Sequence, residues 1–321
     1  MKSLNLHNTH VKKIAKQIKE FSYLDTEKKL RFFHGDSNST RSIEKEDYIW
    51  IDISHLGEVV EINKGKLYAL VEPNISMDKL VASTLKFGLI PEVVMEFPGI
   101  TVGGGVNGAA LESSSFKFGQ FNDTCLEYEI ILGNGKTVKA SQIENKDIFY
   151  GVSGSYGSLG LLTLIKIKLI SSAKYVKTVF YPTNRWKETF ELIEKQTKNE
   201  TINFLEGIVF NKNSSIVITG SFTDKPRENI RTYSKASDLW FYERARKVRQ
   251  QNKVYEEFIP IKNYLFRYNR GAFWMGEYAF SLLHIPNNKI SRFLLNPFMN
   301  TRKLHDGLTA LNIGQKYFVQ D

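Results

Sequence analysis

Apolar and polar positions along the chain predict short strands joined by tight turns and interrupted by a few helices. Residues 48–53, YIWIDI, alternate as a half-buried strand does. The runs EVVEI and LYALVE surround a turn at residues 63–66, and CLEYEIIL and KTVKAS surround Gly-Asn-Gly at residues 133–135. Because turns this short join antiparallel strands, the first half of the chain is expected to contain two β-hairpins.

Helical spacing occurs at two places in the same half. Val11, Ile14, Ile18 and Phe21 recur at helical intervals with lysines between them, which predicts an amphipathic helix near the N-terminus. We expect its apolar face to pack on the protein, and contact with a membrane surface is the alternative. Residues 74–88 predict a second helix that ends at a glycine.

Glycines are concentrated in the segment PGITVGGGVNGAALESSSFKFG, residues 98–119. Gly103, Gly104, Gly105 and Gly108 predict a loop that is free to adopt positive φ and whose bare N–H groups approach a phosphate-bearing cofactor. Three of them also satisfy the dinucleotide motif G-x-G-x-x-G, which belongs to a doubly wound parallel sheet. The next strand instead turns straight back on itself, so we predict an α+β domain with antiparallel hairpins on both sides of the glycines.

The pattern changes after Ser172, where glycines become rarer and aromatic residues more frequent. Residues 175–181 predict a strand, residues 186–196 a helix, and residues 202–210 and 215–220 a hairpin. This order is typical of a small antiparallel sheet with helices on one side. Since a single core seldom serves a chain of 321 residues, we predict two domains, at residues 1–172 and 173–321.

Charge gives a weaker indication of a partner. The formal net charge is +10, but the basic residues are dispersed among acidic ones rather than gathered in one arm. The densest basic run, YERARKVRQQNK at residues 242–253, is interpreted as a solvated helix face, with an anionic partner or an acidic membrane surface as the alternative. We therefore predict no nucleic-acid partner.

Cysteine and histidine usage argues against two classes of site. Cys125 is the single cysteine, which excludes an internal disulfide and fits a reducing compartment, and its apolar neighbours predict a buried thiol. The histidines lack zinc-type spacing except His7 and His10, which we interpret as incidental, so no metal site is expected. The first residues contain no apolar run typical of a signal peptide or membrane span, and the expected location is cytoplasmic.

Several segments, in the same order along the chain, carry a resemblance to a known family. PGITVGGGVNGAALESSSFKFGQF, EIILGNGKTVKAS and DIFYGVSGSYGSLGLLTLIKIKLI resemble the FAD-binding domain of the vanillyl-alcohol-oxidase (PCMH) type. Together with NFLEGIVF and EFIPIKNYLFRYNRGAFW they are similar to the Δ24-sterol reductases within that superfamily. The resemblance implies a PCMH-type FAD-binding domain of two α+β subdomains over residues 1–172, followed by an α+β cap domain over residues 173–321.

The resemblance also implies non-covalent FAD and the positions that contact it. His34 is interpreted as a turn residue rather than a site of covalent flavin attachment. The implied contacts in the glycine segment are Thr101, Val102, Gly103, Gly104, Gly105, Val106, Asn107, Gly108, Ala109, Ala110, Leu111, Glu112 and Ser113. Further contacts are implied at Gly160 and Leu161 and, in a loop that matches less faithfully, at Gly35 and Ser37.

The implied reaction is NADPH-dependent reduction of the Δ24 side-chain double bond of a sterol-like substrate. An unactivated alkene needs a positioned hydride donor and a proton donor. The cap candidates are Glu206, Tyr268 and Arg270, with Trp274 beside them, and the catalytic residue stays unassigned. As structural alternatives, Glu206 pairs with an arginine, Trp274 belongs to the core, and Arg270 binds a phosphate of NADPH.

The family pattern continues beyond Asp321, so we expect an incomplete cap domain. Three functions stay open. The first is a sterol Δ24-reductase, acting alone or with a partner polypeptide that supplies the missing part. The second is another FAD-linked oxidase or dehydrogenase acting on an alcohol or a sugar, and the third is an inactive remnant. Peripheral contact with an internal membrane is compatible with the first.

Overall fold

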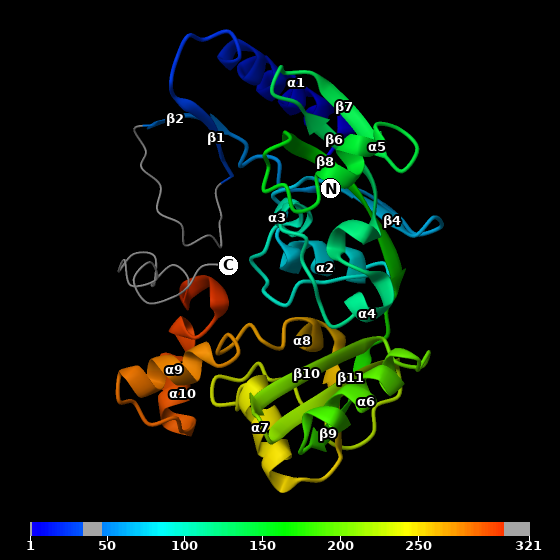
Figure 1. Cartoon of the computed structure of the whole chain (residues 1–321), viewed down its shortest axis with the longest axis vertical. Helices are drawn as coiled ribbons and strands as arrows, with labels where there is room; N and C mark the ends of the chain where they lie inside the picture. The colour runs from blue at the N-terminus through cyan, green and yellow to red at the C-terminus, as the bar shows by residue number, and fades with distance from the viewer. Residues whose placement is uncertain (1, 35–46, 305–321) are drawn as a thin grey trace.

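The computed structural model describes residues 2–34 and 47–304. Figure 1 shows two main sheets, one below the other, with a long helix along the outer side of the first. The first sheet has the strand order β3-β4-β8-β6-β7, and β5 also pairs with β8. All of these pairings are antiparallel, and β3–β4 and β6–β7 are the two predicted hairpins. The strands are β3 (Val59–Asn63), β4 (Tyr68–Val71), β5 (Leu89–Pro91), β6 (Cys125–Ile131), β7 (Thr137–Ser141) and β8 (Leu161–Ser171).

The N-terminal helix α1 (Leu4–Phe21) packs on this first half of the protein. It lies beside a separate parallel pair, β1 (Lys29–Phe33) and β2 (Tyr48–Asp52). The apolar side chains of Val11, Ile14 and Ile18 are buried. They form one cluster with Ile51, Ile53, Leu56, Ile131 and Leu161. The prediction that this face packs on the protein is therefore confirmed.

A buried ionic cluster fixes the start of α1. His7 is fully buried, and its Nδ1 lies 2.8 Å from Oε1 of Glu72 while its Nε2 lies 3.2 Å from Oε1 of Glu129. Lys2 donates to Glu72 at 2.6 Å, and Thr163 donates to Glu129 at 2.6 Å. Burial opposes the charged imidazole, but the hydrogen bonds and charges of the two carboxylates raise the pKa of His7 to about 9.

His7 therefore has a structural role of its own, and the ring of His10 contacts His55 instead, with 4.3 Å between the ring centroids. Among the residues that the structure describes, no group of histidine, cysteine and acidic side chains could hold a metal ion. Cys125 is buried, as predicted.

The second sheet has the order β10-β11-β9-β12, again entirely antiparallel. Its strands and helices are β9 (Tyr175–Thr183), α6 (Trp186–Thr197), β10 (Phe204–Asn211), β11 (Ser214–Thr223), α7 (Phe241–Gln251) and β12 (Tyr255–Pro260). The prediction of helices on one side is wrong. Val217 packs in a cluster with Leu192 and Ile193 of α6, whereas its neighbours Ile216 and Ile218 cluster with residues that include Phe241 of α7.

The reason is that three consecutive apolar residues in β11 give both faces of the sheet an apolar surface. Each face then requires a helix to cover it. The basic run in α7 is also less solvated than expected. Arg246 forms a bidentate ion pair with Glu277, and Arg244 stacks over the ring of Tyr255 at 4.4 Å.

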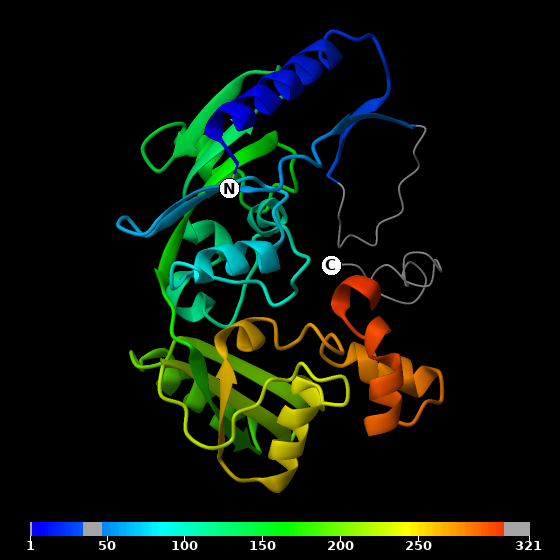
Figure 2. The ribbon, with the colours of Figure 1, turned by 180° about the vertical axis from the view of Figure 1, so that it is seen from behind.

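The C-terminal helices lie beside the second sheet, as both Figure 1 and Figure 2 show. They are α8 (Ile261–Leu265), α9 (Met275–Leu282), α10 (Lys289–Leu295) and the short η3 (Asn296–Phe298). Several large apolar side chains of this region are more than half exposed: Tyr278, Leu282, Leu283, Ile290, Phe293, Leu294 and Phe298. Within the described ranges, every helix is too short or too polar to cross a membrane.

The chain passes between the sheets where β8 ends at Ser171 and β9 begins at Tyr175. One buried cluster contains residues of both sheets, including Leu169 of β8 and Val176 of β9. The division at residue 172 stays a prediction, because the two halves share this core. The remaining short elements are α2 (Met77–Leu85), α3 (Val102–Asn107), α4 (Ser115–Phe118), η2 (Phe121–Thr124) and α5 (Lys146–Gly151).

Candidate functional site

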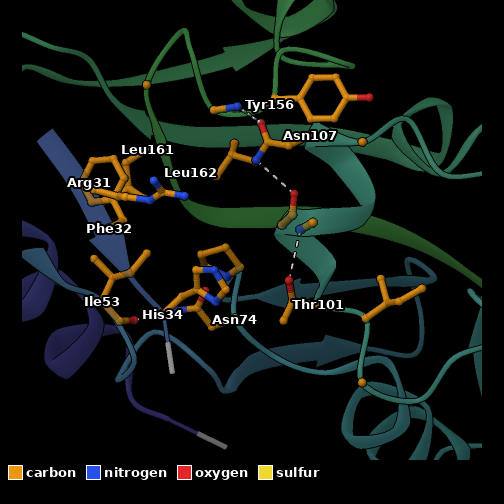
Figure 3. Close-up of a pocket in the computed structure, with 18 residues that line it drawn as sticks. Arg31, Phe32, His34, Ile53, Asn74, Thr101, Asn107, Tyr156, Leu161 and Leu162 are labelled. Atoms are coloured by element: carbon orange, nitrogen blue, oxygen red, sulfur yellow. Dashed lines mark hydrogen bonds between the residues drawn. The ribbon is translucent and has the colours of Figure 1, made fainter. Parts of the chain in front are cut away.

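A cavity of about 500 Å³ opens where the glycine segment meets the β1–β2 pair. Its size lies in the usual range of small-molecule sites. Figure 3 shows side chains that reach it from separate parts of the chain. Arg31 comes from β1, Ile53 follows β2, Asn74 precedes α2, Asn107 ends α3, and Leu161 begins β8.

The glycine segment forms a short helix, α3, rather than the predicted loop. Thr101 is its N-cap and accepts a hydrogen bond from the N–H of Gly104 at 3.1 Å. The N–H of Gly103 donates to the carbonyl of Pro73 at 2.8 Å, and that of Gly105 to the carbonyl of Thr101 at 2.9 Å. The expectation of bare amides is therefore wrong at these glycines, because helix formation and contact with residue 73 already use them.

Close packing explains two of the glycines. A Cβ atom on Gly103 would lie 2.7 Å from Cβ of Pro73, and one on Gly105 would lie 2.4 Å from Cε of Met95. None of the four glycines has positive φ, so the predicted conformational reason is also wrong. Gly104 and Gly108 are exposed and line the cavity, where the missing side chains leave the helix surface open to a ligand.

Asn107 connects α3 to the second glycine-rich loop. Its Oδ1 accepts hydrogen bonds from the N–H of Gly157 and the hydroxyl of Ser155, both at 3.2 Å. Its Nδ2 donates to the carbonyl of Gly103 at 3.0 Å, and its own carbonyl accepts from the N–H of Tyr156 at 3.3 Å. These bonds, part of which Figure 3 draws, hold the two glycine segments against one another on one side of the cavity.

The second glycine-rich loop, residues 154–160, requires glycine at two positions because its backbone adopts positive φ there. Gly154 and Gly157 have φ of 68° and 81°, in the left-handed region. Gly160 lies so close to β6 that a Cβ atom would approach the carbonyl oxygen of Ile131 to 2.5 Å. The loop therefore passes tightly over the sheet and delivers Leu161 to the cavity.

The cavity is electrostatically suited to an anion. Arg31 is partly buried over the rings of Tyr48 and Trp50, at 4.8 and 5.6 Å from their centroids. No carboxylate is found among its described lining residues. His34 also lines it, and its buried Nδ1 has no hydrogen-bond partner in the part of the chain that the structure describes.

The structure brings about half of the implied cofactor positions together. Those that line the cavity are Thr101, Gly103, Gly104, Asn107, Gly108, Gly160 and Leu161. Those that do not are Val102, Gly105, Val106, Ala109, Ala110, Leu111, Glu112 and Ser113. Gly35 and Ser37 lie outside the described residues. Sequence reasoning missed Arg31, Asn74 and Tyr156, and the aromatic-basic pattern of β1 and β2 was the signal available for the first.

Two of the candidate cap residues, Glu206 and Tyr268, lie together at the junction of the two halves. Glu206 accepts hydrogen bonds from Nε and Nη2 of Arg267, at 3.0 and 2.9 Å, and from the hydroxyl of Tyr268 at 2.8 Å. Arg267 also donates to Oγ of Ser113 at 3.3 Å, and the carbonyl of Ser113 accepts from the N–H of Leu205 at 2.7 Å. Ser113 therefore connects the halves, and Glu206 has the arginine partner considered as its structural alternative.

The other two cap candidates, Arg270 and Trp274, lie outside this cluster. Arg270 donates to Oδ1 of Asn296 and to the carbonyls of Tyr233 and Ala236, so its guanidinium binds protein groups. Trp274 is 60% exposed, so the suggestion that it belongs to the core is wrong. Tyr268 is almost fully buried, and burial raises the pKa of its hydroxyl well above the ordinary range.

Comparison with known proteins agrees with a cofactor site here. The family model described as an FAD binding domain matches residues 9–141, which include most of the cavity wall. A Delta(24)-sterol reductase of Mus musculus is 32% identical over 276 residues, 83% of this chain and 52% of the relative. A Delta(24)-sterol reductase of Arabidopsis thaliana is 28% identical over 84% of this chain and 51% of the relative.

A more distant relative has another name. Cytokinin dehydrogenase 1 of Arabidopsis thaliana is 23% identical over 240 residues, 73% of this chain and 41% of the relative. The chain thus spans about half the length of the two Delta(24)-sterol reductases.

Proposed function

Because the chain belongs to the PCMH-type FAD-binding family, we propose that it contributes the cofactor-binding part of an FAD-linked oxidoreductase. The reaction that we propose is NADPH-dependent reduction of the Δ24 side-chain double bond of a sterol. Its support is the similarity to the Delta(24)-sterol reductases over 83% of the chain. The observation that carries the cofactor assignment is the cavity between the two glycine segments.

The residues of this cavity fit FAD. The pyrophosphate of a dinucleotide is anionic, and Arg31 is the cation that lines the cavity, without a lining carboxylate among the described residues to oppose it. Nδ1 of His34, which has no hydrogen-bond partner among the described residues, offers a further polar contact. The open surface of α3 at Gly104 and Gly108 allows a bulky group to approach the backbone.

FAD, when bound, would supply the hydride that reduction of an isolated double bond requires. The chain itself binds and orients. Asn107 fixes the two glycine segments, and the cluster of Glu206, Arg267 and Tyr268 fixes the cap on the cofactor domain through Ser113. We assign these cap residues a positioning role, since their polar atoms are engaged with one another, and we assign no proton donor.

One observation favours a second function. The similarity to a protein named Cytokinin dehydrogenase 1 favours the alternative of another FAD-linked oxidase or dehydrogenase, for which we propose an alcohol or a sugar as the substrate. The identity is lower, so we place this function second. An inactive remnant, a partner polypeptide and peripheral membrane contact stay predictions, and the exposed apolar side chains of α9 and α10 support the second of these.

Anaerobic absorbance spectroscopy of the flavin-loaded chain separates these functions. NADPH is expected to bleach the flavin, and a sterol with a Δ24 double bond is expected to restore its absorbance as the product forms. Bleaching by an alcohol or a sugar, with no response to NADPH, would contradict the reductase and support the second function. Flavin that responds to neither would support the inactive remnant.

A further inference from the structure

A second cavity, of about 300 Å³, is rich in basic side chains. Its walls are the segment that precedes α7 and one face of α7 itself. Four lining residues are cations, Arg231, Lys235, Arg244 and Lys247, and Asp238 is the one carboxylate among the lining residues described. This composition favours an anionic ligand.

Neighbouring groups neutralise only part of this charge. Nε of Arg244 lies 3.5 Å from Oε2 of Glu257, which is fully buried, and Arg231 also interacts electrostatically with that carboxylate. Lys235 and Lys247 are exposed, and neither forms an ion pair within residues 2–34 and 47–304. Four cations against the carboxylates of Asp238 and Glu257 leave an excess of two positive charges.

Hydrogen bonds hold the wall of this cavity in place. The N–H of Arg231 donates to the carbonyl of Phe258 in β12 at 2.9 Å. Arg270 donates to the carbonyl of Tyr233 at 3.2 Å and to that of Ala236 at 2.7 Å. The segment that carries Arg231 and Lys235 is therefore ordered in advance, which reduces the entropy lost when a ligand binds.

A third cavity, of about 470 Å³, connects this region with the first half of the protein. Thr232 and Tyr233 line both the basic cavity and this third one. The third cavity is also lined by Asp78 and Pro98, and Pro98 directly precedes Gly99, which lines the cofactor cavity. The three cavities thus follow one another across the junction of the two halves.

We propose that the basic cavity binds the phosphate groups of a nucleotide, whose remaining part extends along the third cavity toward the cofactor cavity. The recognition of phosphate stands on Arg231, Lys235, Arg244 and Lys247 alone. The identification of this nucleotide as the electron donor NADPH rests on the proposed function.

The test is isothermal titration calorimetry of the full chain with adenosine 2′,5′-bisphosphate, with adenosine as the uncharged comparison. We expect the bisphosphate to bind and adenosine to bind far more weakly. The affinity for the bisphosphate should fall as salt is added, because salt screens the attraction between charges. The double substitution Lys235→Gln and Lys247→Gln is expected to weaken bisphosphate binding about tenfold. The matched control, Lys195→Gln with Lys212→Gln, replaces two exposed lysines outside the cavity and is expected to leave the affinity unchanged.

Equal affinities for the two double variants would overturn the site, as would failure of the unsubstituted chain to bind the bisphosphate. Vesicles of phosphatidylcholine with phosphatidylserine form a further arm. Vesicle binding that depends on Lys235 and Lys247, without nucleotide binding, would overturn the nucleotide assignment in favour of lipid head groups. A chain that binds the bisphosphate at these lysines but holds no flavin would support the site and contradict only the proposed function.

Discussion

The side-chain oxygen of Asn107 accepts a hydrogen bond from the N–H of Gly157 at 3.2 Å, across 50 positions of the chain. One residue thereby joins the glycine helix α3 to the loop that precedes β8. The carbonyl of Gly103 accepts a hydrogen bond from Nδ2 of the same side chain. An amide can satisfy a donor and an acceptor at once, so this one side chain binds to both walls of the cavity.

Replacing Asn107 with leucine removes the three hydrogen bonds of its side chain at similar volume. Loss of the two bonds from Ser155 and Gly157 is expected to loosen the 154–160 loop and to weaken FAD binding about tenfold, as measured by quenching of flavin fluorescence. Asn213→Leu, in the turn between β10 and β11, is the matched control and should leave the affinity unchanged. Equal effects of the two substitutions would show that Asn107 does not organise the cavity.

Neighbouring glycines of α3 are expected to differ in what they control. A methyl group on Gly103 would meet Pro73, including its carbonyl oxygen at 3.1 Å, so Gly103→Ala should lower the free energy of unfolding by about 1–3 kcal/mol. Gly104 faces the cavity, so Gly104→Ala should mainly weaken FAD binding. Chemical denaturation of each variant and its flavin titration check this. A loss of stability in Gly104→Ala and a loss of FAD affinity alone in Gly103→Ala would contradict the packing of α3.

The stability contributed by His7 is expected to depend on pH. Its pKa rises from 6.5 to about 9 on folding, so protonated His7 stabilises the fold fully below the lower value, and this contribution disappears as the pH rises through the higher one. The shift corresponds to roughly 3 kcal/mol. Denaturation at a series of pH values should show that the free energy of unfolding differs between His7→Gln and the unsubstituted chain, and that this difference decreases as the pH rises from 6.5 to about 9.

Lys12→Gln, on the exposed face of the same helix, provides the control, and its difference from the unsubstituted chain should stay small throughout. A difference for His7→Gln that grows with pH would mean that the imidazole is neutral in the folded protein.

Glu206 is expected to be more important for stability than for cofactor binding. Glu206→Gln leaves the nearly buried guanidinium of Arg267 without its charged partner, which should lower the free energy of unfolding by about 2–4 kcal/mol. Tyr268→Phe removes one hydrogen bond and should cost about 1 kcal/mol. Flavin affinity should stay unchanged in both. A loss of flavin reoxidation by substrate, with normal stability, would instead indicate a catalytic role.

The sequence predicted the elements of the fold well. Hairpin turns such as residues 63–66 are local signals, and both β3–β4 and β6–β7 formed as expected. The α+β class followed from them. The second sheet was predicted with helices on one side from the order of its elements, a strand, a helix and a hairpin. The three consecutive apolar residues 216–218 of β11 indicated instead that both faces of the sheet are apolar. The packing of α6 on one face and α7 on the other shows that both faces are covered.

The site was predicted less completely, for a physical reason. The cavity is assembled from segments distant in the chain, and Arg31 becomes part of it only because β1 pairs with β2 beside α3. Three of the four glycines line the cavity, but the N–H groups that were expected to be free for a cofactor bind other groups of the protein. Whether a glycine offers an amide or allows close packing depends on its neighbour, here Pro73 for Gly103, and no local pattern identifies that neighbour.

The central claim is that the cavity beside α3 binds FAD, and the most direct test is titration of the purified chain with FAD by flavin fluorescence. The account predicts binding at one site, weakened about tenfold by Arg31→Gln and unchanged by Lys29→Gln, which replaces an exposed cation of the same strand outside the cavity. Absence of FAD binding, or equal affinities for the two variants, would contradict it.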